Sequence, residues 1–181
     1  MRLKFAGQSR RMLIRTAFVA ALFFGTSAFD CIAHAASIRI VALGASNTNG
    51  KGVGSGDAWP SVLQRLLQAR GYDVIVTVNA MNGRTSSTIL GLVDSAVTPG
   101  TQVVIFDIGM ANDRKTGVSR AETQAHKAEI EARIRAHGAR PIFAPYEGCA
   151  RQPDGRHLSV GGHAQVAARL VPLVIASAHP H

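Results

Sequence analysis

The strongest constraint on the fold is a regular alternation between short apolar segments and longer segments with helical periodicity. The apolar segments predict four strands: Ile38–Leu43, Val74–Val78, Val103–Asp107 and Pro141–Ala144. The remaining segments predict four helices: Ala58–Ala69, Ser87–Ala96, Arg120–Ala136 and Val160–Val171. Strands that alternate with helices form a parallel sheet with helices on both faces. The predicted fold is therefore α/β, a small flavodoxin-like three-layer sandwich with a four-stranded parallel sheet.

Local signals mark the ends of the predicted helices. Ser119-Arg120-Ala121-Glu122 has the spacing of a capping box, and Gly138 lies just beyond the expected end of that helix. Gly71 has the same relation to the first helix. Pro172 is expected to end or kink the last helix, because proline has no N–H to donate.

The first 35 residues have the pattern of an export signal. Residues 1–15 carry five Lys/Arg and no acid, residues 16–29 are mostly apolar, and Ala33-His34-Ala35 is a small-x-small cleavage pattern. The apolar part is short for a membrane-spanning helix. The Arg10-Arg11 pair leaves a twin-arginine signal and an ordinary Sec signal both open. We expect a periplasmic or secreted bacterial protein, cleaved near Ala35, with a single domain over residues 36–181.

Composition argues against several other classes of protein. The formal net charge is +9, but five basic residues and Asp30 lie in the leader, which leaves 15 Lys/Arg against 10 Asp/Glu, or +5. The basic residues are dispersed, so a nucleic-acid partner is not expected. Only Cys149 follows the leader, and no Cys/His spacing typical of a metal site is present. We expect no cofactor, no metal and no stable membrane anchor, and the oligomeric state is open.

Polar residues follow each predicted strand where the chain leaves the sheet. Ser46 follows the first strand, Asn82-Gly83 the second and Asn112-Asp113 the third, while Asp154 and His157 precede the last helix. Right-handed crossovers place all strand-to-helix loops on one edge of a parallel sheet, where such folds bind ligands. We therefore expect these residues to face one cleft.

Three of them have the residue types of a nucleophile–base–orienter triad. A serine hydroxyl is a weak nucleophile that needs a base, and His157 could take the proton of Ser46. Asp154, three residues before His157, could orient the imidazole. Attack on an ester carbonyl also needs hydrogen-bond donors for the developing oxyanion. The candidates are the backbone N–H groups of Ser46 and Gly83 and the side-chain amide of Asn112.

These segments, taken together, resemble the four sequence blocks of the SGNH, or GDSL-type, hydrolase family. The matching segments are Gly44-Ala45-Ser46-Asn47-Thr48, Asn79-Ala80-Met81-Asn82-Gly83-Arg84-Thr85, Gly109-Met110-Ala111-Asn112-Asp113 and Asp154-Gly155-Arg156-His157-Leu158-Ser159 with Gly162. The subgroup that they most resemble is that of small periplasmic arylesterases and multifunctional thioesterase/lysophospholipases. The resemblance implies a flavodoxin-like fold, an acyl-serine intermediate and a site made of Ser46, Gly83, Asn112, Asp154 and His157.

The chain departs from the family pattern in three places. Ala45 stands where the family usually has Asp, which removes a supporting carboxylate beside the nucleophile. Gly109 lies three residues before Asn112 where two is usual, a difference that a small bulge could absorb or that could misdirect the Asn112 side chain. Only nine residues separate Ala144 from Asp154, where relatives usually carry a further helix and strand. We expect the short segment to leave a four-stranded sheet and a more open cleft.

The remaining polar and aromatic residues are expected to have structural roles. Trp59 is expected in the core or the cleft wall, Cys149 as an unreactive thiol and Asp113 as a support for its loop. The other side chains expected on the surface or in structural contacts are His126, His137, His163, Arg84 and Arg114.

The predicted function is hydrolysis of carboxylic esters, with thioesters as an extension. Ser46, His157 and Asp154 would act as nucleophile, base and orienter on a small-molecule ester. The same site could serve a carbohydrate deacetylase or acyltransferase. Two rival hypotheses are a non-catalytic periplasmic binding domain, derived from an eroded hydrolase, and a truncated reading frame that does not fold stably.

Overall fold

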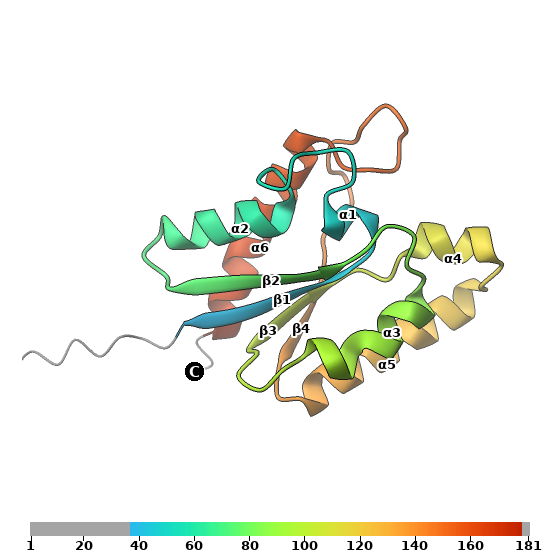
Figure 1. The fold of residues 1–181 in the computed structure, drawn as a ribbon, viewed down its shortest axis with the longest axis horizontal. Coiled ribbons are helices and arrows are strands. Elements are labelled where there is room, and N and C mark those ends of the chain that lie inside the picture. The colour runs from blue at the N-terminus through green and yellow to red at the C-terminus, as the bar shows by residue number, and fades with distance from the viewer. Residues whose placement is uncertain (1–36, 179–181) are drawn as a thin grey trace, which may run out of the picture. The chain divides into compact units, whose positions relative to one another are not determined.

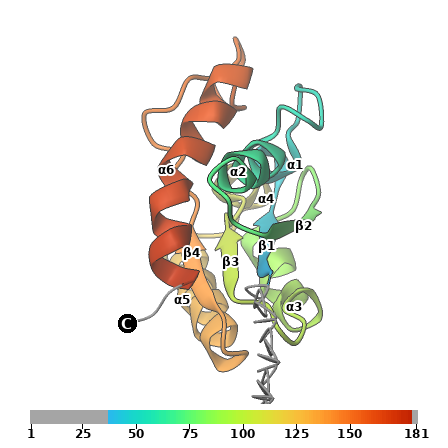
Figure 2. The same cartoon turned by 90° about the vertical axis from the view of Figure 1, so that its left-hand side faces the viewer.

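The computed structural model describes residues 37–178, which belong to a unit spanning His34–His181. The predicted leader, residues 1–35, lies outside the described part. The described residues form a four-stranded, all-parallel sheet in the order β2-β1-β3-β4 (Figure 2). Its strands are β1 (Ile38–Gly44), β2 (Val74–Ala80), β3 (Val103–Phe106) and β4 (Arg140–Phe143). The predicted α/β fold with a small parallel sheet is confirmed.

Helices cover both faces of this sheet (Figures 1 and 2). One face carries α2 (Trp59–Gln68) and α6 (Val160–Ala178), and the other carries α3 (Ser86–Ala96) and α5 (Arg120–Ala136). Side chains of the central strand alternate between the two sides, as the pleat requires. Ile40 packs on the first side and Val41 on the second, and both are buried. This burial on both faces explains why β3 and residues 40–43 of β1 are continuous apolar runs, whereas Arg39 of β1 is exposed.

The predicted elements match the observed ones to within a few residues, with two exceptions. Two short helices, α1 (Ser46–Asn49) and α4 (Met110–Thr116), were not predicted, because a single turn or two shows no apolar periodicity. Of the two outcomes expected at Pro172, an end of the last helix or a kink in it, the end is wrong. Helix α6 continues to Ala178, and Val171 and Val174 on either side of the proline are buried in the core.

Among the described helices, α6 is the one long and apolar enough to cross a membrane by length and composition. Its buried side chains belong to the core that it shares with α2 and the sheet. Core helices of this kind pass the same test, so the property is weak support for a membrane span.

Helices α1 and α4 lie at the carboxyl ends of the strands (Figure 1). The loops after β2 and β4 reach the same edge, because parallel strands all end there. This edge therefore carries every residue predicted for the site.

Candidate active site

Ser46 is the first residue of α1 and directly follows the buried turn residue Ala45. The Ser46 side chain is half-buried, and it lines two neighbouring cavities. The first N–H groups of a helix have no partner inside the helix. The N–H of Ser46 makes no hydrogen bond within residues 37–178, so it is free to bind an oxyanion.

His157 and Asp154 lie in the loop between β4 and α6 and are bonded to each other. The Asp154 carboxylate accepts hydrogen bonds from Nδ1 of His157 and, over 2.9 Å, from the backbone N–H groups of Arg156 and His157. The His157 side chain is 13% exposed and that of Asp154 is 41% exposed. With Nδ1 engaged, Nε2 is the imidazole nitrogen available to Ser46.

The turn geometry keeps Asp154 ionised. The two backbone N–H groups, and then the imidazole of His157, hold the pKa of the Asp154 carboxyl well below its usual range. A carboxylate at this position fixes the imidazole tautomer and favours the imidazolium form once a proton arrives.

Asn47 ties this loop to the turn that carries Ser46, a role that the sequence block containing Asn47 did not reveal. Its side-chain oxygen accepts a hydrogen bond from the N–H of Leu158 over 2.9 Å, and its side-chain amide donates to the carbonyl of Arg156 over 3.5 Å. The residue next to the nucleophile therefore holds the segment that carries His157.

Gly83 lies at the tip of the loop after β2 with a φ of 87°, a left-handed conformation that favours glycine. A Cβ at Gly83 would meet no atom within 4 Å, so the space beside it is open to a substrate. Its N–H makes no hydrogen bond within the described residues. Arg84 next to it is bound to Asn79 over 2.8 Å and 2.9 Å and lines neither cavity, in keeping with a structural role.

Asn112 lies in the first turn of α4, and its backbone N–H donates to the carbonyl of Gly109 over 2.7 Å. Its side-chain amide donates to the carbonyl of Arg84 over 2.8 Å. Gly109, which precedes this helix, has a φ of 60°. A Cβ at Gly109 would lie 2.2 Å from the carbonyl oxygen of Arg84, so only glycine fits there.

The structure brings four of the five predicted site residues to one cavity of about 280 Å³. Ser46, Gly83, Asn112 and His157 line it, and Asp154 stands behind His157. A hydroxyl, an imidazole and three groups that each have an N–H hydrogen available can together carry out acyl transfer.

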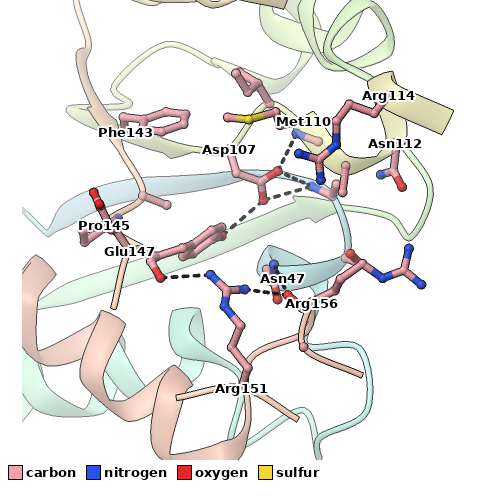
Figure 3. Close-up of a pocket in the computed structure, with 18 residues that line it drawn as sticks. Asn47, Asp107, Met110, Asn112, Arg114, Phe143, Pro145, Glu147, Arg151 and Arg156 are labelled. Carbon is pink, nitrogen blue, oxygen red and sulfur yellow. Dashed lines mark hydrogen bonds between the residues drawn. The ribbon is translucent and has the colours of Figure 1, made fainter. Parts of the chain in front are cut away.

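A larger cavity of about 610 Å³ adjoins the first and shares Ser46 and Asn112 with it. Its wall includes Met110 and Phe143, and Asp107 lies at its base among hydrogen bonds to backbone N–H groups (Figure 3). The two cavities meet at Ser46, so the two halves of an ester could occupy one each.

Other residues singled out in the sequence have structural contacts. Trp59 is fully buried, Cys149 is buried, and the buried carboxylate of Asp113 accepts from the N–H of Ser86 over 2.8 Å and from Oγ1 of Thr123 over 2.7 Å. His126 is bonded to Ser86, His137 to Asp94 and His163 to the N–H of Trp59. Among residues 37–178, no three His, Cys, Asp or Glu side chains form a group that could hold a metal ion.

Comparison with protein families gives a match to the GDSL-like lipase/acylhydrolase family over residues 42–176. The matched region contains all four sequence blocks. A comparison with curated proteins found no match for this chain.

Solved structures share the fold at low sequence identity. TesA is 18% identical with a TM-score of 0.66, over 78% of this chain and 99% of TesA. AlinE4, described as an SGNH-hydrolase family esterase, is 20% identical with a TM-score of 0.55, over 77% of this chain and 73% of its own. A family 3 carbohydrate esterase of Clostridium thermocellum is 18% identical with a TM-score of 0.56, over 79% of this chain and its whole length.

Proposed function

The chain belongs to the GDSL-like lipase/acylhydrolase family, and from this premise we propose that it hydrolyses carboxylic esters through an acyl-serine intermediate on Ser46. The observation that carries the proposal is the meeting of Ser46, His157 and two further donor residues on one cavity, with Asp154 bonded behind the imidazole.

The mechanism follows from the hydrogen bond between Nδ1 of His157 and Asp154, which leaves Nε2 as the base. Nε2 of His157 takes the proton of Ser46 while Oγ attacks the carbonyl carbon of the ester. The tetrahedral intermediate collapses when the C–O bond to the alcohol breaks, and the alcohol oxygen takes the proton back from Nε2. Water then gives a proton to the same nitrogen and attacks the acyl carbon. The bond from that carbon to Oγ breaks, Oγ takes the proton back from Nε2, and the acid leaves.

Three donors would stabilise the oxyanion. The N–H groups of Ser46 and Gly83 have no competing partner within the described residues. The side-chain amide of Asn112 has two hydrogens, and one of them is used by the carbonyl of Arg84. The other supports the role of Asn112 as a third donor.

The charge of the smaller cavity favours esters that carry a negative group. Lys51, Lys115 and Arg156 line it, and none of the residues that line it is acidic. No described ion pair involves these three side chains. Cationic walls raise the local concentration of anionic substrates. A carboxylate- or phosphate-bearing ester is therefore the substrate class that the cavity suits.

Export and thioester hydrolysis belong to the same proposal. The basic, apolar and small-x-small segments of residues 1–35 support export to the periplasm or the medium. Thioesters and acylated sugars pass through the same acyl-serine, so the choice among these substrates depends on what the two cavities admit.

Hydrolysis of p-nitrophenyl esters over a range of acyl lengths tests the proposal, with the Ser46→Ala variant as the reference. Loss of the nucleophile should lower kcat by a factor on the order of 10⁴ or more. A fluorophosphonate probe should label the wild-type protein on Ser46 and leave the variant unlabelled. A folded wild type no faster than Ser46→Ala would favour a non-catalytic binding domain.

A further inference from the structure

Asp107 lies directly after β3 and directs its carboxylate toward the nucleophile turn. The residue is only 6% exposed. Its two oxygens accept from the N–H of Ala45, each over 3.2 Å, and Oδ1 also accepts from the N–H of Gly109 over 2.9 Å (Figure 3). Ala45 precedes the nucleophile, and Gly109 begins the turn that carries Asn112. One carboxylate therefore joins the turn before Ser46 to the turn before Asn112.

Two hydroxyl groups complete the contacts of this carboxylate. Oγ1 of Thr48 donates to Oδ2 over 2.5 Å, and the phenol of Tyr146 lies 3.2 Å from the same oxygen. Thr48 is in α1, two residues after Ser46, so the helix that begins at the nucleophile is held at both its start and its first turn.

Tyr146 brings the shortened segment after β4 into the same network. Its oxygen lies 2.8 Å from Oγ1 of Thr48 and accepts from Nε1 of the buried Trp59 over 3.1 Å. Burial, and then the charge of Asp107, raise the pKa of the Tyr146 phenol well above its usual value. The phenol therefore keeps its proton as a hydrogen-bond donor.

The chain is shaped for this close approach. A Cβ at Gly44 would lie 2.4 Å from Oδ2 of Asp107 and 2.5 Å from Oγ1 of Thr48. Gly44 is thus required to be glycine by the carboxylate and hydroxyl packed against it. Ala45, where the family usually has Asp, offers no carboxylate of its own.

We infer that Asp107 is the positioning residue of this site. Its buried carboxylate, at the end of β3, supports the turn before Ser46, where Ala45 has no carboxylate of its own. It touches none of Ser46, His157 and Asn112 through a hydrogen bond within the described residues, and it acts through the backbone of Ala45 and Gly109. Its function is to fix the Ser46 hydroxyl and N–H relative to Asn112. This inference rests on the proposed ester hydrolysis.

The test compares Asp107→Asn with Asp73→Asn, which alters an exposed aspartate just before β2 whose side chain is bonded only to Ser37 within the described residues. Asparagine at position 107 keeps the shape but presents an N–H₂ group to donors, so one of the amide or hydroxyl contacts is lost. We expect kcat to fall by about a hundredfold with little change in KM, because misplacement by an ångström costs that much. Asp73→Asn should match the wild type. A folded Asp107→Asn enzyme with wild-type kcat would overturn the inference.

Two further measurements separate this result from trouble with folding or with the proposed function. Thr48→Val removes one hydroxyl donor and leaves the carboxylate in place, so kcat should fall in the same direction by a smaller factor; an unchanged kcat counts against the inference even if Asp107→Asn does not fold. Hydrogen exchange of the Ala45 and Gly109 amides needs no turnover. Faster exchange in Asp107→Asn supports the anchoring, and unchanged exchange refutes it. Absence of ester hydrolysis and of Ser46 labelling in the wild type would refute the proposed function separately.

Discussion

The side-chain amide of Asn112 donates a hydrogen bond to the backbone carbonyl of Arg84 over 2.8 Å, so the loop after β3 holds the loop after β2 in place. The second hydrogen of that amide remains for an oxyanion. One side chain thereby positions the loop that carries Gly83 and, in the proposed mechanism, also supplies the third donor to the oxyanion.

Asn112→Ala should lose both contributions. We expect kcat to fall by about 10²–10³ with a smaller change in KM, the scale seen when one oxyanion donor is removed. Steady-state kinetics on a p-nitrophenyl ester gives the answer. Thr116→Ala is the control on the same helix, because its hydroxyl is bonded only to carbonyls within α4. A folded Asn112→Ala enzyme with normal kcat would exclude Asn112 as a donor.

Asp154→Asn separates the orientation of His157 from the fold of its turn. The side-chain oxygen can still accept from the backbone N–H groups of Arg156 and His157, so the turn should persist. The new N–H₂ group faces Nδ1 of His157 and favours the wrong tautomer, so kcat should fall by roughly 10⁴. An activity within tenfold of the wild type, with an unchanged melting temperature, would show that Asp154 does not orient the base.

Adjacent glycines at the start of α6 offer a matched pair for the loop that carries the triad. A Cβ at Gly162 would lie 1.9 Å from the carbonyl oxygen of Ala150, whereas one at Gly161 would meet only Oγ of Ser159, 3.9 Å away. Gly162→Ala should lower both the melting temperature and kcat, because the backbone before His157 must move. Gly161→Ala should be neutral or stabilise the helix by up to about 1 kcal/mol. Thermal unfolding of the two variants distinguishes these outcomes, and equal melting temperatures would contradict the close packing.

The alternation of short apolar segments with helical segments was enough to predict the four parallel strands. The signal is strongest in β1 and β3, because these strands are buried on both faces of the sheet. The same topology placed Ser46, Gly83, Asn112 and His157 on one edge before any contact was known. What remained hidden depends on distances between loops. Asp107 was placed at the end of a strand without a role, and Tyr146 was not singled out, because neither lies in a spacing pattern with Ser46.

At Pro172, by contrast, a local sequence signal was visible but tertiary packing decided the outcome. Its local chemistry predicts a helix end or a kink, and the helix does not end there: Val171 and Val174 are buried in the core on either side of the proline. Tertiary packing outweighs one lost backbone hydrogen bond here. The sequence also shows an extra residue before Asn112, but not that the Asn112 side chain is bonded to the carbonyl of Arg84, because that contact joins two loops far apart in the chain.

The cationic wall of the smaller cavity predicts a preference among substrates. An aryl acetate that carries a carboxylate should be hydrolysed with a higher kcat/KM than its neutral methyl-ester counterpart, and added salt should reduce the difference. The triple variant Lys51→Gln, Lys115→Gln, Arg156→Gln should abolish the preference and leave hydrolysis of the neutral ester within a few-fold of the wild type. Arg70→Gln is the matched control, because Arg70 lies just after α2, lines neither cavity, and has its side chain bonded only to the carbonyl of Leu66 within the described residues. Equal kcat/KM values for the charged and neutral esters would count against an anionic substrate.

His163 links stability to pH. Its side chain is fully buried, Nδ1 accepts from the N–H of Trp59 over 3.2 Å, and Nε2 has no hydrogen-bond partner within the described residues. Burial lowers the pKa of this imidazole in the folded state. The unfolded chain therefore binds the proton more readily, so the stabilising contribution of neutral His163 is complete above about pH 6.5 and is lost as the pH falls toward the lowered pKa.

His163→Asn keeps an acceptor near the N–H of Trp59 and removes the titration. Thermal unfolding between pH 7.5 and pH 5 should show a larger fall in melting temperature for the wild type than for the variant. Parallel curves for the two proteins would mean that His163 does not couple protonation to folding.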